Sequence, residues 1–186
     1  MLELDRKIEN ILLQGKKIND GRGWFYVPIN IQELQEIGIE FSNVCQLNHS
    51  FTHKSGVIRG LNYQSPPYQQ SKIVRCVRGK VYSVAVDIDK KSDTYGQWCG
   101  FMLSEENMYL HYVPNHFAHG FITMENNTEI EYLTDNLYSF SHAKSVLWSD
   151  QDIGIDWTCG GLVEIESSII SEKNRNAELL KNIDFS

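Results

Sequence analysis

The sequence predicts an all-β fold, a double-sheet jelly roll with short flanking helices. Short runs rich in β-branched and aromatic residues recur along most of the chain. Clusters of glycine, proline, asparagine and aspartate separate these runs at intervals of about 8–12 residues, the spacing of sandwiches and barrels. Segments with helical periodicity are few and short. Many short strands with few helices are typical of jelly rolls.

The predicted strands begin in the first quarter of the chain and continue to about its three-quarter point. The clearest reads Val-Tyr-Ser-Val-Ala-Val-Asp-Ile and follows a turn at Arg78 and Gly79. The full set comprises residues 41–47, 57–63, 71–77, 81–88, 98–103, 108–113, 120–124 and 128–134.

Two helices are predicted beside these strands. Residues 31–37 have Asn30 as a candidate N-cap and Gly38 just beyond their end. Residues 171–182 carry two leucines near a charged run and would form a C-terminal helical tail. The sequence shows no internal repeat and no convincing linker, so residues 1–186 are interpreted as a single domain.

The composition of the chain limits its possible binding partners and cellular location. A formal net charge of −7 argues against nucleic acid. No window has the apolar length of a membrane helix, and the first residues, Met-Leu-Glu-Leu-Asp-Arg-Lys, do not resemble a signal peptide. We therefore expect a cytoplasmic protein without a membrane partner. The four cysteines share no zinc-site spacing, and we interpret them as small buried hydrophobic residues.

Several motifs occur in a specific order. Residues 59–64 read Arg-Gly-Leu-Asn-Tyr-Gln, residues 71–75 read Ser-Lys-Ile-Val-Arg, and residues 113–121 read Val-Pro-Asn-His-Phe-Ala-His-Gly-Phe. Together with Asp-Gly-Arg-Gly-Trp-Phe at residues 20–25, they resemble the dTDP-4-dehydrorhamnose 3,5-epimerase family. The resemblance implies a cupin-type double-stranded β-helix and a homodimer. It also implies that each barrel binds a nucleotide-linked 4-keto-6-deoxy sugar, with no metal or other cofactor.

The chain departs from the family at the decisive position. The family motif is Arg-Gly-Leu-His-Tyr/Phe-Gln, and its histidine is the catalytic base, whereas this chain has Asn62 there. A carboxamide does not take up a proton at any useful pH. The family aspartate that orients the histidine corresponds to Asn174, in Ile-Ser-Glu-Lys-Asn against Leu-Ser-x-Lys-Asp. Both members of the base dyad are then amides.

Epimerisation beside a ketone needs a base on one face of the carbon, an acid on the other, and donors for the enolate oxygen. The resemblance assigns Lys72 to the enolate, Tyr132 to the acid and His119 to the pocket floor. From the residues alone, Lys72 could equally be a solvated strand lysine, and Tyr132 a core or rim tyrosine.

The resemblance also implies a set of substrate-binding residues. Two arginines would contact the nucleotide diphosphate, although a surface salt bridge is the alternative for each. Two aromatic residues would supply stacking surface, and the remaining side chains would line the pocket. The set is Arg22, Trp24, Phe25, Gln46, Asn48, Arg59, Gln64 and Tyr138.

Two hypotheses of different classes follow. The first is an epimerase of altered scope, in which His119, a water molecule, or Tyr132 with its pKa lowered by Lys72 acts as base at one centre. The second is a non-catalytic relative that binds a nucleotide sugar and has no need of a base. Isomerisation of a keto sugar is a third interpretation; it also needs a base and rests on analogy with other cupins.

Overall fold

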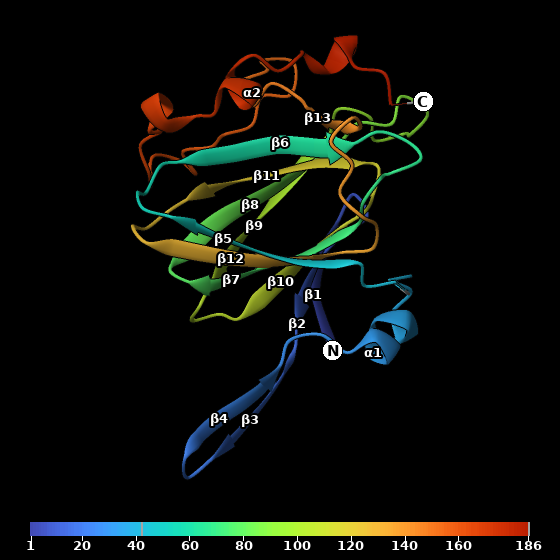
Figure 1. Ribbon diagram of the computed structural model, residues 1–186. Coiled ribbons are helices and arrows are strands. Elements are labelled where there is room, and N and C mark those ends of the chain that lie inside the picture. The colour runs from blue at the N-terminus through green and yellow to red at the C-terminus, as the bar shows by residue number, and fades with distance from the viewer. Residues whose placement is uncertain (42, 186) are drawn as a thin grey trace.

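Two antiparallel sheets face each other in the computed structural model, which describes residues 1–41 and 43–185 (Figure 1). One sheet has the strand order β1-β2-β10-β7-β12-β5, and the other has the order β13-β6-β11-β8-β9. A separate hairpin, β3-β4, projects away from the barrel. This arrangement confirms the predicted jelly roll. The strands are β1 (Leu2–Lys7), β2 (Asn10–Gln14), β3 (Lys16–Asp20), β4 (Gly23–Val27), β5 (Gln46–Thr52), β6 (Ile58–Gln64), β7 (Lys72–Arg78), β8 (Lys80–Asp87), β9 (Trp98–Ser104), β10 (Tyr109–Val113), β11 (Phe117–Thr123), β12 (Thr128–Thr134) and β13 (Ala143–Ser145).

The strand predictions between residues 57 and 134 are confirmed as β6 to β12. The prediction for residues 41–47 is wrong, because β5 begins at Gln46 and Phe41 is instead buried in a cluster around Leu34. Ser42, within that predicted segment, lies outside the described residues. The strands β1 to β4 and β13 were not predicted. Strand β1 alternates apolar and charged residues, β3 is exposed along its whole length, and β13 has only three residues.

Three hydrophobic clusters hold the barrel together. One occupies part of the space between the sheets and includes Ala85 and Phe121. A second covers the outer face of the five-stranded sheet, where Val84 packs in the same cluster as Trp157 of the C-terminal segment. The third lies on the outer face of the six-stranded sheet. Successive residues of a strand point to opposite faces, so β8, covered on both faces, is buried over most of its length.

The first predicted helix is confirmed, and the second is not. Helix α1 (Ile31–Glu36) is capped by the Asn30 side chain, which accepts hydrogen bonds from the first-turn amides. Gly38 follows it with φ of 81°. The prediction of one helix over residues 171–182 is wrong. Helix α2 (Glu172–Arg175) is a single short turn, and the chain then runs extended over the sheet to the 3₁₀ turn η2 (Leu180–Asn182).

Cysteine burial agrees with the sequence interpretation only in part. Cys76 and Cys99 are buried, as expected. Cys45 is exposed and Cys159 is half-buried, so the interpretation is wrong for these two. Among the helices of the described residues, none is long and apolar enough to cross a membrane.

The backbones of β6 and β11 approach each other unusually closely. A Cβ atom added to Gly60 would lie 2.5 Å from the Cα atom of Gly120, and Gly60 has φ of 123°. Glycine alone tolerates both conditions without strain. The pairing register shifts by one residue between His119 and Phe121 at this point. The glycines therefore bring together the two strands that carry the central polar residues of the pocket.

Candidate active site

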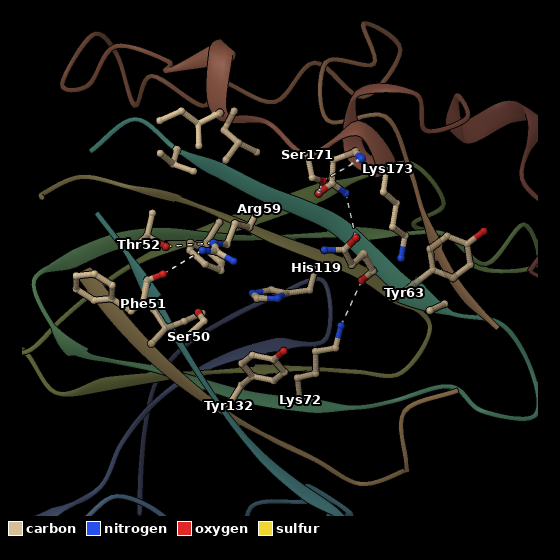
Figure 2. Close-up of a pocket in the computed structure, with 18 of the residues that line it drawn as sticks. Ser50, Phe51, Thr52, Arg59, Tyr63, Lys72, His119, Tyr132, Ser171 and Lys173 are labelled. Carbon is tan, nitrogen blue, oxygen red and sulfur yellow. Dashed lines mark hydrogen bonds between the residues drawn. The ribbon is translucent and has the colours of Figure 1, made fainter. Parts of the chain in front are cut away.

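A pocket of about 700 Å³ lies between the two sheets and is lined by residues of both (Figure 2). Its walls come from β5, β6, β7, β11, β12, β13 and the segment around α2. Among the described residues that line it, none is an aspartate or a glutamate. The polar and charged lining includes Arg59, Asn62, Gln64, Lys72, His119, Tyr132, Tyr138, Ser171, Lys173 and Asn174.

Asn62 lies at the centre of one wall, flanked by a neighbour on each adjacent strand. Strand pairing places His119 of β11 on one side of it and Ser145 of β13 on the other. Residues directly opposite in an antiparallel pair have side chains on the same face of the sheet, about 5 Å apart. His119 is therefore the immediate neighbour of the position that should carry the base.

Hydrogen bonds fix the side chain of Asn62. Its Oδ1 accepts from Ser145 Oγ at 2.7 Å and from Asn174 Nδ2 at 3.0 Å. Asn174 is held in turn by Ser171, whose hydroxyl donates to Asn174 Oδ1 at 2.9 Å. Asn174 therefore contacts Asn62 directly, which agrees with its correspondence to the family aspartate.

Lys72 enters the pocket from β7 on the opposite sheet. Its side chain is buried, and Nζ donates to the backbone oxygen of Asn62 at 3.2 Å. Burial is the main cause that lowers the pKa of Lys72 to about 8, and Lys173 adds to this effect while Asp135 opposes it. At pH 7 most Lys72 side chains remain charged. The residue is therefore a buried cation, and not the solvated strand lysine that was its alternative.

A chain of buried polar groups runs from the pocket to β2 and fixes the protonation of His119. Asn10 donates through Nδ2 to the backbone oxygen of Ile8, so its Oδ1, 3.1 Å from His111 Nε2, must accept. His111 Nδ1 is then the acceptor for the Ser83 hydroxyl at 2.9 Å. Ser83 Oγ in turn accepts from His119 Nε2 at 2.9 Å.

This series of hydrogen bonds leaves the Nδ1 atom of His119 without a proton. No partner for Nδ1 exists among the described residues, where every buried side-chain nitrogen or oxygen has one, so Nδ1 opens onto the pocket. Burial, together with Lys72 and His111, holds the pKa of His119 well below its usual value. His119 is therefore a neutral imidazole that offers a lone pair to a ligand.

Tyr132 rises from β12 beside Lys72, across the pocket from His119 (Figure 2). Burial raises the pKa of Tyr132, and nearby Arg59 offsets this only in part. The alternative in which Tyr132 acts as the base requires a lowered pKa, and the shift has the opposite direction because burial disfavours the phenolate more than Arg59 favours it. Tyr132 is consequently a protonated phenol, suited to an acid and unsuited to a base.

Three further predicted residues shape the pocket rim. Arg59 is anchored to β5 through Thr52 Oγ1 at 3.1 Å and the Phe51 backbone oxygen at 3.0 Å. Gln64 donates to the Leu137 backbone oxygen and accepts from the backbone nitrogen of Ser139. It therefore holds the loop that places Tyr138 at the pocket.

Gln46 and Asn48 lie on β5 outside the described pocket lining. Gln46 Oε1 accepts from the backbone nitrogen of Tyr138 at 2.7 Å, so it supports the same loop. Asn48 is paired with Tyr132 on the neighbouring strand β12, and Tyr132 lines the pocket whereas Asn48 does not. Their assignment to the substrate stays a prediction.

The structure does not bring Arg22, Trp24 and Phe25 to the pocket of their own chain. They belong to the projecting β3-β4 hairpin, whose base is tied to the barrel by Tyr26 (Figure 1). Trp24 is 56% exposed and Phe25 64% exposed, and Arg22 forms an ion pair with Asp20. Their role in substrate binding also stays a prediction.

Sequence reasoning missed three residues of the site. Ser145 and Ser171 hold the two amides, and Lys173 adds a second ammonium group at the pocket. Burial lowers the pKa of Lys173 as well. Ser171 and Lys173 belong to the motif Ile-Ser-Glu-Lys-Asn at residues 170–174, which is the signal that marks them. Ser145 has no motif and is identified by strand pairing alone.

The charge of the pocket has the opposite sign to the net charge of the whole chain. The net charge is −7, yet the charged groups lining the pocket described here are cations. Such a site favours an anionic ligand or an anion that forms during reaction. No group of three histidine, cysteine, aspartate or glutamate side chains with metal-binding geometry occurs within residues 1–41 and 43–185.

The fold and the pocket define a cupin with a cationic ligand site inside its barrel. A family profile described as dTDP-4-dehydrorhamnose 3,5-epimerase matches residues 6–182. A dTDP-4-dehydrorhamnose 3,5-epimerase of Shigella flexneri is 38% identical over 175 residues, covering 94% of this chain and 93% of the relative.

Two solved structures show the same similarity. The dTDP-4-dehydrorhamnose 3,5-epimerase from Bacillus anthracis, with TDP and PPi bound, is 35% identical with a TM-score of 0.88, covering 96% of this chain and 98% of its own. The dTDP-6-deoxy-D-glucose-3,5-epimerase from Legionella pneumophila, in complex with dTDP-4-keto-L-rhamnose, is 34% identical with a TM-score of 0.88, covering 98% and 94%. The chain belongs to the dTDP-4-dehydrorhamnose 3,5-epimerase family.

Proposed function

We propose that the protein is a sugar-nucleotide epimerase that inverts one carbon next to the ketone of a nucleotide-linked 4-keto-6-deoxy sugar. The observation that carries this proposal is the convergence of His119 from one sheet with Lys72 and Tyr132 from the other. A lone pair, a cation and a phenol then face a single cavity from opposite sides. The keto-sugar ligand of the Legionella pneumophila relative is of the class proposed.

The proton transfers follow from these side chains. His119 Nδ1 removes the proton from the α-carbon, and the bonding electrons move onto the ketone oxygen to give an enolate. The ammonium group of Lys72, which is itself buried, stabilises this charge. Tyr132 then returns a proton to the opposite face, and its phenolate regains one from His119 by way of solvent. The net result is inversion, with no atom gained or lost.

His119 restricts both the rate and the scope of this chemistry. Its low pKa makes it a weaker base than a histidine near neutrality, so turnover is expected to be slow. It also lies one strand away from Asn62 and approaches the sugar ring from one side. A single centre of inversion is therefore proposed.

The same proposal includes a homodimer in the cytoplasm. Arg22, Trp24 and Phe25 can reach a nucleotide only in the pocket of another subunit, because their hairpin extends away from their own barrel (Figure 1). Their exposure supports such an intersubunit role. Four free thiols suit a reducing compartment.

Mixed dimers test the shared site. Arg22→Ala and Lys72→Met subunits should each be inactive as homodimers. After mixing and subunit exchange, one site per heterodimer regains both side chains, so activity should return to about a quarter of the unmodified level, as random pairing of intact sites predicts. Inactivity of the mixture, with heterodimers present by native mass spectrometry, would contradict the shared site.

Deuterium incorporation tests the chemistry. The protein is incubated in D₂O with dTDP-4-keto-6-deoxyglucose, and exchange at C3 and C5 is followed by NMR. We expect exchange at one carbon, slowed about 10²–10⁴-fold in His119→Gln, which keeps an amide of similar size but lacks a base. A protein that binds dTDP and the keto sugar tightly, yet exchanges neither proton, would be the non-catalytic relative instead.

A further inference from the structure

The amide of Asn62 has a fixed polarity that faces the pocket. Its Oδ1 accepts two hydrogen bonds, at 2.7 Å from Ser145 and 3.0 Å from Asn174. A carbonyl oxygen has two lone pairs, so this acceptor is fully used. Nδ2 has no partner among the described residues, where all buried side-chain nitrogens and oxygens are satisfied, and Asn62 lines the pocket. The two N–H groups therefore open onto the cavity.

The surrounding network prevents this amide from turning over. Ser171 Oγ accepts from the backbone nitrogen of Asn174, so its proton is directed to Asn174 Oδ1. Asn174 must consequently present Nδ2 to Asn62, and it also contacts Ser145 Oγ at 3.3 Å. A flipped Asn62 would place N–H groups against these donors and leave its oxygen in the pocket. The order of donors and acceptors thus runs in one direction from Ser171 to Asn62.

We propose that Asn62 is a substrate-contacting residue that donates through Nδ2 to the ketone oxygen of the sugar, beside the ammonium group of Lys72. Asn174, Ser145 and Ser171 are the positioning residues for this donor. The identity of the oxygen rests on the proposed function, whereas the direction of the donor does not.

Lys72 gives the reason for choosing the ketone oxygen. Its Nζ lies 3.2 Å from the backbone oxygen of Asn62, so the ammonium and the amide of this residue belong to one small region of the wall. Negative charge collects on the ketone oxygen as the enolate forms. Donors that are already oriented, in a site that excludes most water, stabilise such a charge strongly. Where the family has a base, this chain therefore has a hydrogen-bond donor.

The first test needs no ligand. The side-chain NH₂ signal of Asn62 is identified by its loss in Asn62→Ala, and its exchange with water is measured by ¹⁵N NMR. In the unmodified protein both protons should exchange freely. In Asn174→Asp, the new carboxylate accepts but does not donate, so Asn62 should rotate and one proton should exchange about tenfold more slowly, as one added hydrogen bond implies. Asn182→Asp adds the same charge on an exposed residue and should change nothing.

The second test uses the substrate. Binding of dTDP-4-keto-6-deoxyglucose should shift the Asn62 NH₂ signal, whereas dTDP alone should not. Asn62→Ala should lower the maximal rate of deuterium exchange about 10²-fold, as loss of one oxyanion donor does, with little change in the substrate concentration at half-maximal rate. Asn174→Asp should lower the same rate although it touches the amide and not the ketone.

The two tests separate the inference from the proposed function. Slow exchange of the Asn62 protons in the unmodified protein, with no change in Asn174→Asp, would overturn the donor orientation. Free exchange of those protons, without any deuterium incorporation into the keto sugar, would overturn the catalytic role and the proposed function together. An unchanged rate in Asn62→Ala would overturn the role of Asn62 and leave the function standing.

Discussion

Replacing Lys72 by methionine is expected to stabilise the fold at neutral pH while abolishing deuterium exchange. Burial is the main cause that lowers the pKa of Lys72 to about 8. Each pKa unit corresponds to about 1.4 kcal/mol, and the ordinary lysine value is near 10.4. The charged ammonium therefore costs the folded protein about 3 kcal/mol at pH 7. Methionine removes this cost but also the hydrogen bond that the ammonium group donates to Asn62, and a hydrogen bond from a charged group is worth about 1.5–3 kcal/mol.

The sign of the effect changes with pH in a defined window. Below about pH 8 the lysine is charged in both states, and the folded state bears the full cost. Between about pH 8 and 10.4 the unfolded chain keeps the proton that the folded protein has lost, so the stability of the unmodified protein rises with pH. The advantage of Lys72→Met, about 1 kcal/mol at pH 7, should therefore disappear by about pH 9.

Urea unfolding followed by tryptophan fluorescence at several pH values measures this difference directly. Lys90→Met, at an exposed lysine, is the matched control and should show no pH-dependent gain. Binding of dTDP by Lys72→Met should be retained, which would show that the pocket is intact. A variant less stable than the unmodified protein at pH 7, or a difference that stays constant from pH 6 to pH 10, would refute this account of Lys72.

Two other substitutions probe the chemistry on either side of the pocket. Ser83→Ala leaves the facing nitrogens of His111 and His119 without a partner, so we expect a loss of about 2–4 kcal/mol in the free energy of urea unfolding and slower deuterium exchange. A variant as stable as the unmodified protein would contradict the buried chain. Tyr132→Phe should still wash deuterium into the substrate, but inversion scored from NMR coupling constants should fall about 10²–10⁴-fold. Equal loss of both signals would show that Tyr132 is not the acid.

The sequence identified the middle of the fold much better than its ends. Strands such as β8 are buried on both faces, so their hydrophobic runs are long and distinct. The sequence of β1, Leu-Glu-Leu-Asp-Arg-Lys, alternates apolar and charged residues over few positions, and β3 is exposed throughout. Such strands form because a neighbouring strand offers hydrogen bonds, which composition does not reveal. The prediction of a helix over residues 171–182 was wrong because it relied on two leucines as one face of a helix. In the structure Leu180 is buried, but it belongs to a 3₁₀ turn.

Motifs led to the residues that line the pocket but not to the partners that orient them. Lys72 and Tyr132 occur in recognisable patterns, and the structure places both at the cavity. The chain that fixes the tautomer of His119 joins Asn10 to His111, which are 101 residues apart. Nothing in either local sequence marks this contact. The direction of the Tyr132 pKa shift, which decides between an acid and a base, was likewise beyond the sequence, because the degree of burial is a property of the fold.

The two amides at positions 62 and 174 make most physical sense as a pair. If Asn174 were an aspartate, its carboxylate would attract Nδ2 of Asn62 and turn the oxygen into the pocket, where it would face the developing enolate. If Asn62 were a histidine beside Asn174, the ring nitrogen that meets the Asn174 amide would be an acceptor. The other ring nitrogen would then carry the proton toward the substrate and could not remove one. The Asn174 amide thus directs Nδ2 of Asn62 into the pocket, and the same amide would direct the proton of a histidine there. Restoring a base at position 62 therefore requires an acceptor at position 174 as well.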